Sequence, residues 1–506
     1  MTLDFIVPIV NANDAEHHAQ AAQGNAAVAE EAVGVLRDAL SGDTPETRIL
    51  LRAAAGAGKS FVLKRLVTDC LLHPAVARVS VVAFTNNQLY PLAESLGSSL
   101  GRDVVCLFSS QDRVDGIPEE AANASTVVTK AEEIPDTARV VISTVHKLKA
   151  SPPAKLVNDL GPGGNGDTAF DVLFVDEAWQ VPHHLFDGVS KHALIWVGVG
   201  DVGQIPPLEV GANPWRGDPG HNPYRAWPTD YDDGTDPETW VRELPAVWRP
   251  TVGHLDVWRA FYPDWDKLSC VSGPGDRWVE FGDMHDLAKA VWSQVTSGAP
   301  TLLVVDGLPA ADAADVDLPL LTVAEELIAE LLAAKPVLHW NKMDDSGTPT
   351  GEVTRQSLGD ATSDPMVAIL ATRNQAVNDA ADAVERLVDR FSLKPTDLVS
   401  STVDSWQGQT NGITVAVHPL SGASALDEFN SAFGRLAVAC TRATHGLLML
   451  TRPGLDELLA AAPARPGTAI GEPGFRTLPR QTHQRILASF ARGTLTWTTL
   501  DDTKGA

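Results

Sequence analysis

The chain has 506 residues, 44% of them hydrophobic, which is enough for about two to four domains with buried cores. Acidic residues outnumber basic ones 65 to 39, and the net charge of −26 excludes a protein that coats nucleic acid by bulk electrostatics. The four cysteines have no C-x-x-C spacing and give no signal for a zinc site or an iron–sulfur cluster. The N-terminus has no basic region, and no apolar run reaches the roughly 18 residues of a membrane span. We therefore expect a cytoplasmic protein.

After a helical segment near residues 25–40, short apolar strands alternate with amphipathic helical stretches, a pattern that predicts parallel α/β layers. The expected strands are 49–51, 79–84, 140–142, 172–175, 194–197, 301–305, 367–370, 413–417 and 447–450. A stretch rich in proline and aspartate at 213–240 interrupts them, as a domain junction or a surface insertion. We predict two α/β domains with parallel sheets, at 1–240 and 241–465, and a C-terminal tail at 466–506.

The first strand runs into a glycine-rich segment that is typical of a phosphate-binding loop. Such a loop needs glycines that let backbone N–H groups surround the phosphates, a lysine for the β and γ oxygens, and a hydroxyl for Mg²⁺. The residues assigned to nucleotide binding are Gly56, Ala57, Gly58, Lys59 and Ser60. Ala53 stands where the motif has its first glycine, so an ordinary strand-to-helix turn remains an alternative.

Two later strands end in polar residues that suit the same site. The strand at 171–178 delivers Asp176, which can hold Mg²⁺ together with Ser60, and Glu177, which can polarise a water. The segment 200–207 contains Gln204, which can sense the γ-phosphate or the attacking water. An ordinary acidic turn at the end of a strand is the alternative for 171–178, and an ordinary Gly-Asp turn is the alternative for 200–207. The order of the motifs along the chain weighs against both alternatives.

Asp-Glu-Ala at 176–178 followed by Gly-Asp-x-x-Gln-x-Pro-Pro at 200–207 resembles a superfamily-one helicase. Residues 402–409 resemble motif V of that superfamily, and residues 435–443 resemble motif VI. The resemblance implies two tandem RecA-like P-loop NTPase domains with small insertions, and ATP and Mg²⁺ as cofactors. It also implies that Gly408 contacts the nucleotide.

Within the superfamily, the chain most resembles the branch of the nonsense-mediated-decay helicase. The segments that carry this resemblance are 244–250 with the following Phe261-Tyr262, 371–375 and 403–408. The resemblance implies that Arg249 and Arg442 approach the γ-phosphate from the second domain, where guanidinium groups stabilise transition-state charge and couple hydrolysis to closure. Surface salt bridging is the alternative for each.

Three departures from the family pattern concern nucleotide recognition. Thr410 replaces a glutamate expected near the ribose, and Ala437 replaces a common asparagine. Gln20 and Gln23 are both candidates for the glutamine that reads adenine, without clean spacing. A preference for ATP is therefore an inference from the family.

Two strand ends of the first domain are candidates for contacts with a nucleic-acid strand. Thr85 and Asn86 resemble motif Ia, and Ser143 and Thr144 resemble the next strand-contacting motif. Hydroxyl and amide side chains at strand ends can bond phosphates without sequence preference, and they also favour capping positions. The many Trp and Tyr residues after Gln204 are predicted to pack in the core rather than to stack on bases.

These observations predict a nucleic-acid-dependent ATPase that translocates on single-stranded DNA or RNA, without an attached nuclease. The branch resemblance implies 5′ to 3′ movement. A nucleotide-controlled binding or assembly subunit that regulates a protein partner is the alternative of a different class. A RecD-like or phage-helicase-like motor differs only in its branch.

Overall fold

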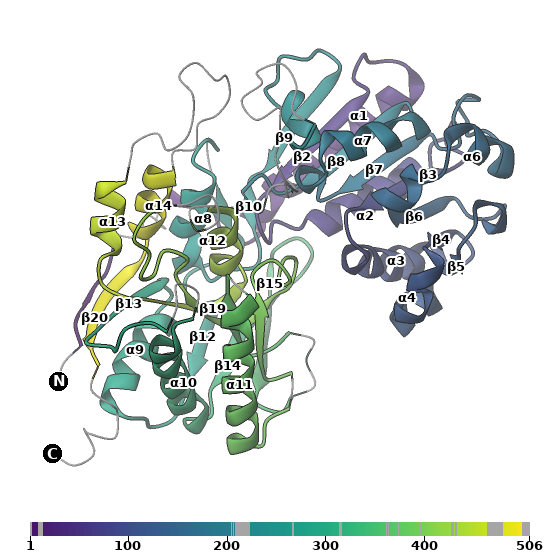
Figure 1. The fold of residues 1–506 in the computed structure, drawn as a ribbon. Coiled ribbons are helices and arrows are strands. Elements are labelled where there is room, and N and C mark those ends of the chain that lie inside the picture. Colours follow the sequence, from purple (N-terminus) through teal and green to yellow (C-terminus); the bar gives the residue numbers. More distant parts are fainter. Residues whose placement is uncertain are drawn as a thin grey trace. The chain divides into compact units, whose positions relative to one another are not determined.

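The computed structural model describes residues 3–8, 14–203, 205, 207, 223–265, 268–312, 316–360, 362, 364–372, 374–394, 396–426, 430, 433–462 and 479–497. The chain divides into two compact units (Figure 1). The N-terminal unit runs from Gly24 to Pro245, apart from a short stretch at Gly203 that groups with the other unit. The C-terminal unit holds the chain from Ala246 onward together with the residues up to Gln23. In the described ranges, no helix has the length and apolar character needed to cross a bilayer.

The N-terminal unit is built on a parallel sheet whose described strands have the order β5-β4-β6-β3-β7-β8-β2-β9. The strands are β2 (Arg48–Ala53), β3 (Val79–Ala83), β4 (Val105–Phe108), β5 (Thr126–Val128), β6 (Val140–Thr144), β7 (Val172–Asp176), β8 (Ile195–Gly200) and β9 (Thr239–Leu244). The central strands are buried along their whole length, as expected for a parallel sheet with helices on both faces. The register aligns Asp176 with Val199 and Arg52 with Gly200, so the carboxyl ends of β7, β8 and β2 share one edge.

Helices surround this sheet and cover its apolar strands. They are α1 (His18–Ser41), α2 (Lys59–Cys70), α3 (Asn86–Leu100), α4 (Glu119–Ala124), α5 (Val145–Lys149), α6 (Pro153–Leu160) and α7 (His183–Val189). The buried residues of α2 recur at helical spacing, from Val62 and Leu63 to Leu66 and Val67, and form its core-facing stripe. The helix following β2 thereby has a fixed orientation against the sheet.

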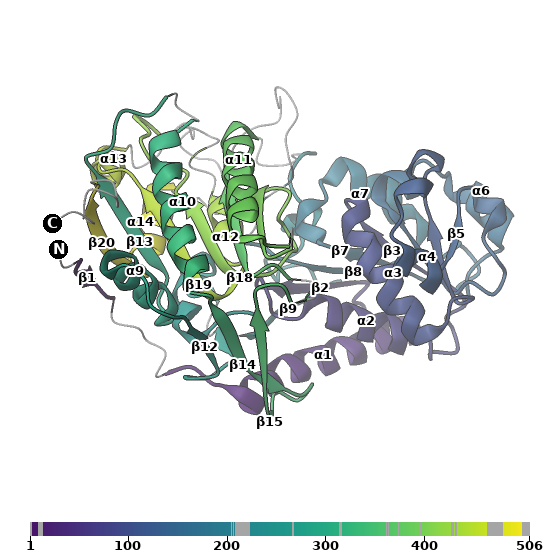
Figure 2. The same ribbon diagram turned by 90° about the horizontal axis from the view of Figure 1, so that it is seen from below.

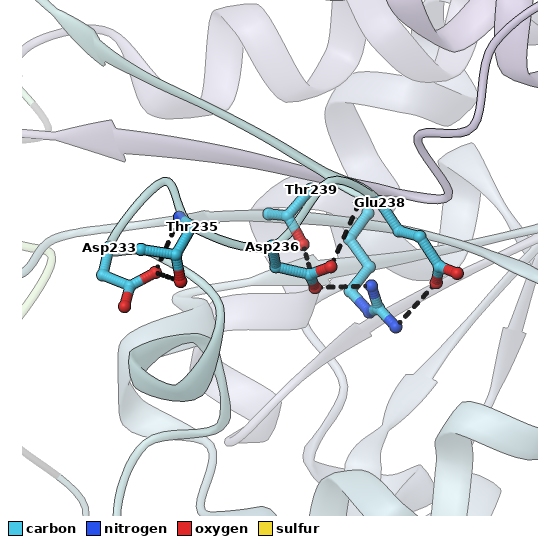
Figure 3. Close-up of polar contacts among 6 residues, drawn as sticks. Asp233, Thr235, Asp236, Glu238 and Thr239 are labelled. Carbon is cyan, nitrogen blue, oxygen red and sulfur yellow. Dashed lines mark hydrogen bonds and ion pairs between the residues drawn. The ribbon is translucent and has the colours of Figure 1, made fainter.

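The aspartate-rich stretch before β9 is a tight loop tied to the sheet. Asp236 accepts hydrogen bonds from the Glu238 N–H at 3.1 Å and the Thr239 hydroxyl at 2.9 Å, and Arg48 of β2 donates to it at 2.7 Å (Figure 3). The Glu238 N–H, the Thr239 hydroxyl and Arg48 lower the pKa of Asp236. These bonds set the start of β9 beside the start of β2. The stretch predicted at 213–240 thus ends in a strand of the N-terminal sheet, and its first part, 213–222, lies outside the described residues.

The C-terminal unit has a second large sheet with described order β1-β20-β13-β19-β18-β16-β17, parallel except for the edge strand β1. Its strands are β1 (Phe5–Ile6), β13 (Thr301–Asp306), β16 (Val367–Ala371), β17 (Leu398–Thr402), β18 (Asn411–Val417), β19 (Ala443–Thr451) and β20 (Ala491–Thr496). A smaller antiparallel sheet joins β12 (Arg277–Glu280), β14 (Val337–Met343) and β15 (Pro349–Ser357). The strands β10 (Ala246–Val247) and β11 (Ser269–Cys270) form a short parallel pair. The predicted α/β class with two parallel-sheet domains is confirmed.

The described helices of this unit are α8 (Leu255–Phe261), α9 (Asp286–Thr296), α10 (Leu318–Ala333), α11 (Asn374–Phe391), α12 (Phe433–Cys440), α13 (Leu455–Ala461) and α14 (Pro479–Leu487). Figure 2 shows α10 and α11 side by side over the seven-stranded sheet, and their apolar residues share one core cluster with α9. Trp292 of α9 lies within that cluster and donates from Nε1 to the Leu327 carbonyl at 2.8 Å.

Both ends of the chain differ from the sequence-based expectation. The residues expected as a tail include α14 and β20, and β20 pairs with β13 inside the sheet over six residues. β1 pairs with β20, so the first residues belong to the C-terminal unit rather than to the first domain. Short strands with loose patterning carry little sequence signal, and pairing with distant strands stabilises them here. The expected boundary at 240/241 lies instead at 245/246.

The aromatic residues of 224–262 pack as predicted rather than forming an open stacking surface. Trp227 is fully buried and stacks on Phe186 at 3.9 Å between ring centroids. Trp258 and Tyr262 are also buried, in the C-terminal unit. Trp215 lies outside the described residues.

Buried histidines in the C-terminal unit predict a loss of stability in acid. Burial lowers the pKa of His254 to about 3, and neither of its ring nitrogens has a hydrogen-bond partner among the described residues. The unfolded chain therefore binds this proton first, and stability is lost as pH falls from about 6.5 toward 3. We expect the thermal unfolding temperature to fall between pH 6.5 and 4. In His254→Leu, the free energy of unfolding should fall less steeply over the same pH range. The difference from wild type should be up to ~1 kcal/mol per pH unit. Equal acid sensitivity in both proteins would contradict this role of His254.

Candidate nucleotide site

The predicted phosphate loop joins β2 to α2 and has the backbone shape that its sequence suggests. Gly56 and Gly58 have φ values of 74° and 93°, a region that residues with a Cβ rarely adopt. Gly58 caps α2, whose 12 residues begin at Lys59. Successive backbone N–H groups and the positive end of the helix dipole favour an anion at this position.

Lys59 and Glu177 are 118 positions apart in sequence and form an ion pair in the structure. Lys59 Nζ donates to Glu177 Oε1 at 2.5 Å, and both side chains are nearly buried, with 12% and 11% exposure. The pair shows that the end of β7 meets the start of α2. The lysine expected to bind phosphates and the carboxylate expected to act on water thus occupy one site.

Glu177 is held in a backbone conformation that a residue with a side chain seldom adopts. Its φ and ψ are 50° and 47°, in the left-handed region. Such a conformation costs on the order of 1–3 kcal/mol and persists only where the surrounding structure imposes it. In this turn the Glu177 carboxylate accepts from Lys59 Nζ. This strain accompanies the residue to which the sequence assigns water activation.

The last residues of β8 make room for that turn. A Cβ on Gly200 would lie 2.8 Å from the backbone nitrogen of Ala178 and 2.8 Å from Cε3 of Trp179. A Cβ on Gly198 would lie 2.9 Å from Cζ2 of Trp227. Glycines in β8 therefore permit the turn after Glu177 to pack directly on the sheet. Gln204, four residues beyond Gly200, lies outside the described residues.

Asp176 and Ser60 are the residues that could hold Mg²⁺. Burial raises the pKa of Asp176, the neighbouring Glu177 carboxylate raises it further, and Lys59 opposes the shift. A cation at this carboxylate would offset that cost. No group of three or more His, Cys, Asp or Glu side chains fit for a metal occurs among the described residues. One carboxylate and one hydroxyl suit Mg²⁺, which takes oxygen ligands and completes its shell with water and phosphate.

A residue that the motif search missed contacts the phosphate loop. Asn25 of α1 is 6% exposed, and its Nδ2 donates to the Ala57 carbonyl at 2.9 Å. Gln20 and Gln23, the candidates for reading adenine, are both exposed and group with the C-terminal unit. An asparagine on an Ala-rich helix carries no signal by itself, so only the fold could reveal Asn25.

Arg249 and Arg442 come together within the C-terminal unit although they are far apart in sequence. Arg249 Nη1 donates to the Thr441 carbonyl at 3.1 Å, and Arg442 Nη2 donates to the Thr441 hydroxyl at 3.1 Å. Arg442 is 1% exposed and also donates from Nε to the Val438 carbonyl at 3.3 Å. Both guanidinium groups thus contact Thr441. The hydrogen bond from Arg442 to the Val438 carbonyl also stabilises the C-terminal unit.

The segment that resembles motif V forms a turn beside these arginines. Gly408 has φ 87°, and the carbonyl of the following Gln409 accepts from Arg442 Nη1 at 3.5 Å. Arg435 pairs with Asp404 at 3.2 Å, which ties the turn to the helix α12 that carries the next motif. Motifs V and VI are therefore one structural cluster within the C-terminal unit.

The candidate nucleic-acid contacts lie at the carboxyl ends of the neighbouring strands β3 and β6. Thr85 caps α3 in a capping box, and its N–H donates to Gln88 Oε1 at 2.9 Å, directly before Asn86. Thr144 caps α5 by accepting from the Lys147 N–H at 3.1 Å. Ser143 is fully buried within β6, so the expected contact from its hydroxyl does not fit the structure. β6 is buried from Val140 to Ser143, and only its last residue, Thr144, is partly exposed.

Comparisons with known proteins add a family match over part of the chain. Residues 37–209, less than half of the chain, match a family described as an AAA domain. The fold resembles PRRSV helicase at 14% identity and a TM-score of 0.37, covering 82% of this chain and 55% of that one. It also resembles arterivirus nonstructural protein 10 (helicase), alone and with DNA, at 13% identity, TM-scores of 0.38 and 0.36, and 82% coverage of this chain.

This chain spans 61% and 62% of those two arterivirus structures, so it corresponds to little more than half of the proteins it resembles. No curated protein matches the sequence. Likeness at this level assigns no activity.

Gly200→Ala tests whether the close packing beneath the Glu177 turn is required. The added Cβ meets backbone of Ala178, which cannot move aside as a flexible side chain can. We expect a loss of about 1–3 kcal/mol in the free energy of unfolding, measured by denaturant titration. Gly34→Ala in α1 is the matched control, because its Cβ meets nothing within 4 Å and alanine favours a helix. Equal stability of the two variants would refute the packing argument.

Arg442→Ala tests whether this arginine has a structural role besides any role in hydrolysis. The substitution leaves the Val438 carbonyl and the Thr441 hydroxyl without a charged donor. We expect a cost of about 1.5–3 kcal/mol in the free energy of unfolding, without any nucleotide. Arg390→Ala, at an exposed site on α11, should stay within ~0.5 kcal/mol of wild type. A stable Arg442→Ala protein would leave catalysis as the remaining reason for this residue.

Proposed function

We propose that this chain is a superfamily-one helicase, a nucleic-acid-dependent ATPase that couples ATP hydrolysis to translocation on single-stranded DNA or RNA. The observation that carries the proposal is the ion pair between Lys59 and Glu177 at the mouth of the phosphate loop. A phosphate-binding lysine beside a strained, nearly buried carboxylate is the pairing that phosphoryl transfer to water needs. The AAA-domain match over residues 37–209 supports a nucleotide-dependent enzyme.

The ion pair suggests how nucleotide binding prepares the site. In the structure, Lys59 Nζ is paired with the Glu177 carboxylate. Phosphate oxygens offer Lys59 Nζ a stronger set of acceptors, and Glu177 then loses its cation and becomes able to accept a proton. Water attacks the γ-phosphorus and the bond from phosphorus to the bridging β-phosphate oxygen breaks. Glu177 takes one proton of the water, the oxygen and its second proton stay on the inorganic phosphate, and ADP leaves. Mg²⁺ at Ser60 and Asp176 would supply charge neutralisation at the phosphate oxygens.

Four further residues complete the proposed site. Arg249 and Arg442 are assigned to stabilise the γ-phosphate during transfer, and their shared contacts at Thr441 support joint action. Gln204 is assigned to orient the attacking water, and Gly408 to nucleotide binding. The resemblance to the nonsense-mediated-decay branch adds 5′ to 3′ movement to the proposal, and the N-terminal sequence adds a cytoplasmic location.

A nucleotide-controlled assembly ATPase that regulates a protein partner is the second candidate. Its support is that the hydroxyl of Thr144 is already engaged in a helix cap and that Ser143 is buried. Fewer free groups then remain at these strand ends for phosphates of a nucleic acid. The net charge of −26 adds repulsion outside any local groove.

ATPase rates measured with single-stranded DNA, with single-stranded RNA and with neither test the proposal. We expect nucleic acid to accelerate the wild type. Lys59→Ala should lose hydrolysis because phosphate binding fails, and Glu177→Gln should lose hydrolysis at least ~100-fold while it still binds ATP. Glu119→Gln, which changes an exposed carboxylate on α4, should hydrolyse at the wild-type rate.

Strand displacement on duplexes with a 5′ or a 3′ tail separates the two candidates and the two polarities. Hydrolysis that no strand accelerates would remove the motor and leave the assembly ATPase. Unwinding from a 3′ tail alone would reject the branch assignment. Normal hydrolysis by Glu177→Gln would show that another group activates the water.

A further inference from the structure

We infer that Asn25 is a positioning residue for the phosphate loop, which orients the Gly58 N–H toward the phosphates of the bound nucleotide. The inference rests on the nucleotide site of the proposed function. It assigns a task to a helix that precedes the recognised motifs. The chemical group it serves is the polyphosphate, and not the base or the sugar.

The contact joins a buried amide to the middle of the loop. Asn25 Nδ2 donates to the Ala57 carbonyl at 2.9 Å, and Asn25 and Ala57 are 6% and 1% exposed. The Ala57 N–H is bonded to the Ala54 carbonyl at 3.0 Å inside the loop. Ala57 is therefore held on both of its sides, by the loop itself and by α1.

Because the peptide bond is planar, the contact of Asn25 with the Ala57 carbonyl also fixes the direction of the Gly58 N–H. In a trans peptide, the carbonyl of one residue and the N–H of the next point in opposite directions. No cis peptide is present among the described residues. Because the Ala57 carbonyl points to α1, the Gly58 N–H points away from α1.

That direction matters because glycines on both sides leave the peptide easy to rotate. Gly56 and Gly58 have φ values of 74° and 93°, and glycine pays little for alternative values. A rotated Ala57–Gly58 peptide would present a carbonyl oxygen to the phosphates in place of an N–H. The Asn25 amide opposes this rotation, because it would lose its acceptor in a buried place.

α1 itself is fixed against β9, the neighbour of β2 in the sheet, and against α2. Glu31 accepts from Trp240 Nε1 of β9 at 3.0 Å, and Glu30 pairs with Arg65 of α2. Ala29 and Ala32 are buried on the same helix. Asn25 is thus presented by a rigid support, as positioning requires.

Equilibrium binding of ATP and of inorganic tripolyphosphate to the full chain tests the inference. Asn25→Asp has nearly the same shape but places an acceptor against the Ala57 carbonyl. We expect about tenfold weaker binding of both ligands, with KM for ATP raised and kcat within about twofold of wild type. Asn25→Ala, which removes the donor without adding charge, should weaken both by about threefold. Asp38→Asn, at an exposed position on the same helix, is the control and should bind as wild type.

The tripolyphosphate arm distinguishes positioning of the loop from a contact with the nucleoside. Weaker ATP binding with unchanged tripolyphosphate binding would overturn the inference, and so would unchanged binding of both by both Asn25 variants. Unfolding temperatures of the variants without ligand should lie within a few degrees of wild type. If the wild type binds ATP in a Lys59-dependent way, failure of the Asn25 prediction concerns this inference alone. If the wild type binds neither ligand, the proposed function itself fails.

Discussion

The ion pair between Lys59 and Glu177 is the interaction on which the site depends. It joins the first residue of α2 to the residue after β7, and it is nearly buried. A buried charge without its partner costs several kcal/mol, so the pair holds two separate strand ends at one place. The left-handed backbone of Glu177 and the glycines of β8 follow from the same requirement, since the turn must present the carboxylate to the lysine.

Several residues of the site have a structural task beside the proposed chemical one. Arg442 donates to the Val438 carbonyl and to the Thr441 hydroxyl, and it is buried. Thr144 caps a helix with the hydroxyl that was predicted to contact a nucleic-acid strand. Changes at such positions are expected to alter stability besides any effect on the proposed activity, so stability and turnover have to be measured together.

The chain shows where sequence reasoning about a site succeeds and where it fails. The phosphate loop, Asp176 and Glu177 could be proposed from the sequence because their residue types occur together in short segments next to apolar strands. Asn25 was missed because nothing near it in sequence signals a role. Ser143 was misjudged because β6 is covered on both faces, so its residues are buried up to the last position, and the motif pattern does not show where that cover ends.

The sequence by itself determined the α/β class, the parallel strands and the order of the nucleotide motifs, because each depends on local periodicity and on short-range turn chemistry. The tertiary structure alone decided that β20 enters the C-terminal sheet and that Asn25 reaches Ala57. It also decided that Arg249 and Arg442 share Thr441. These facts arise from contacts between distant parts of the chain, whose free energy depends on burial and geometry that no short segment contains.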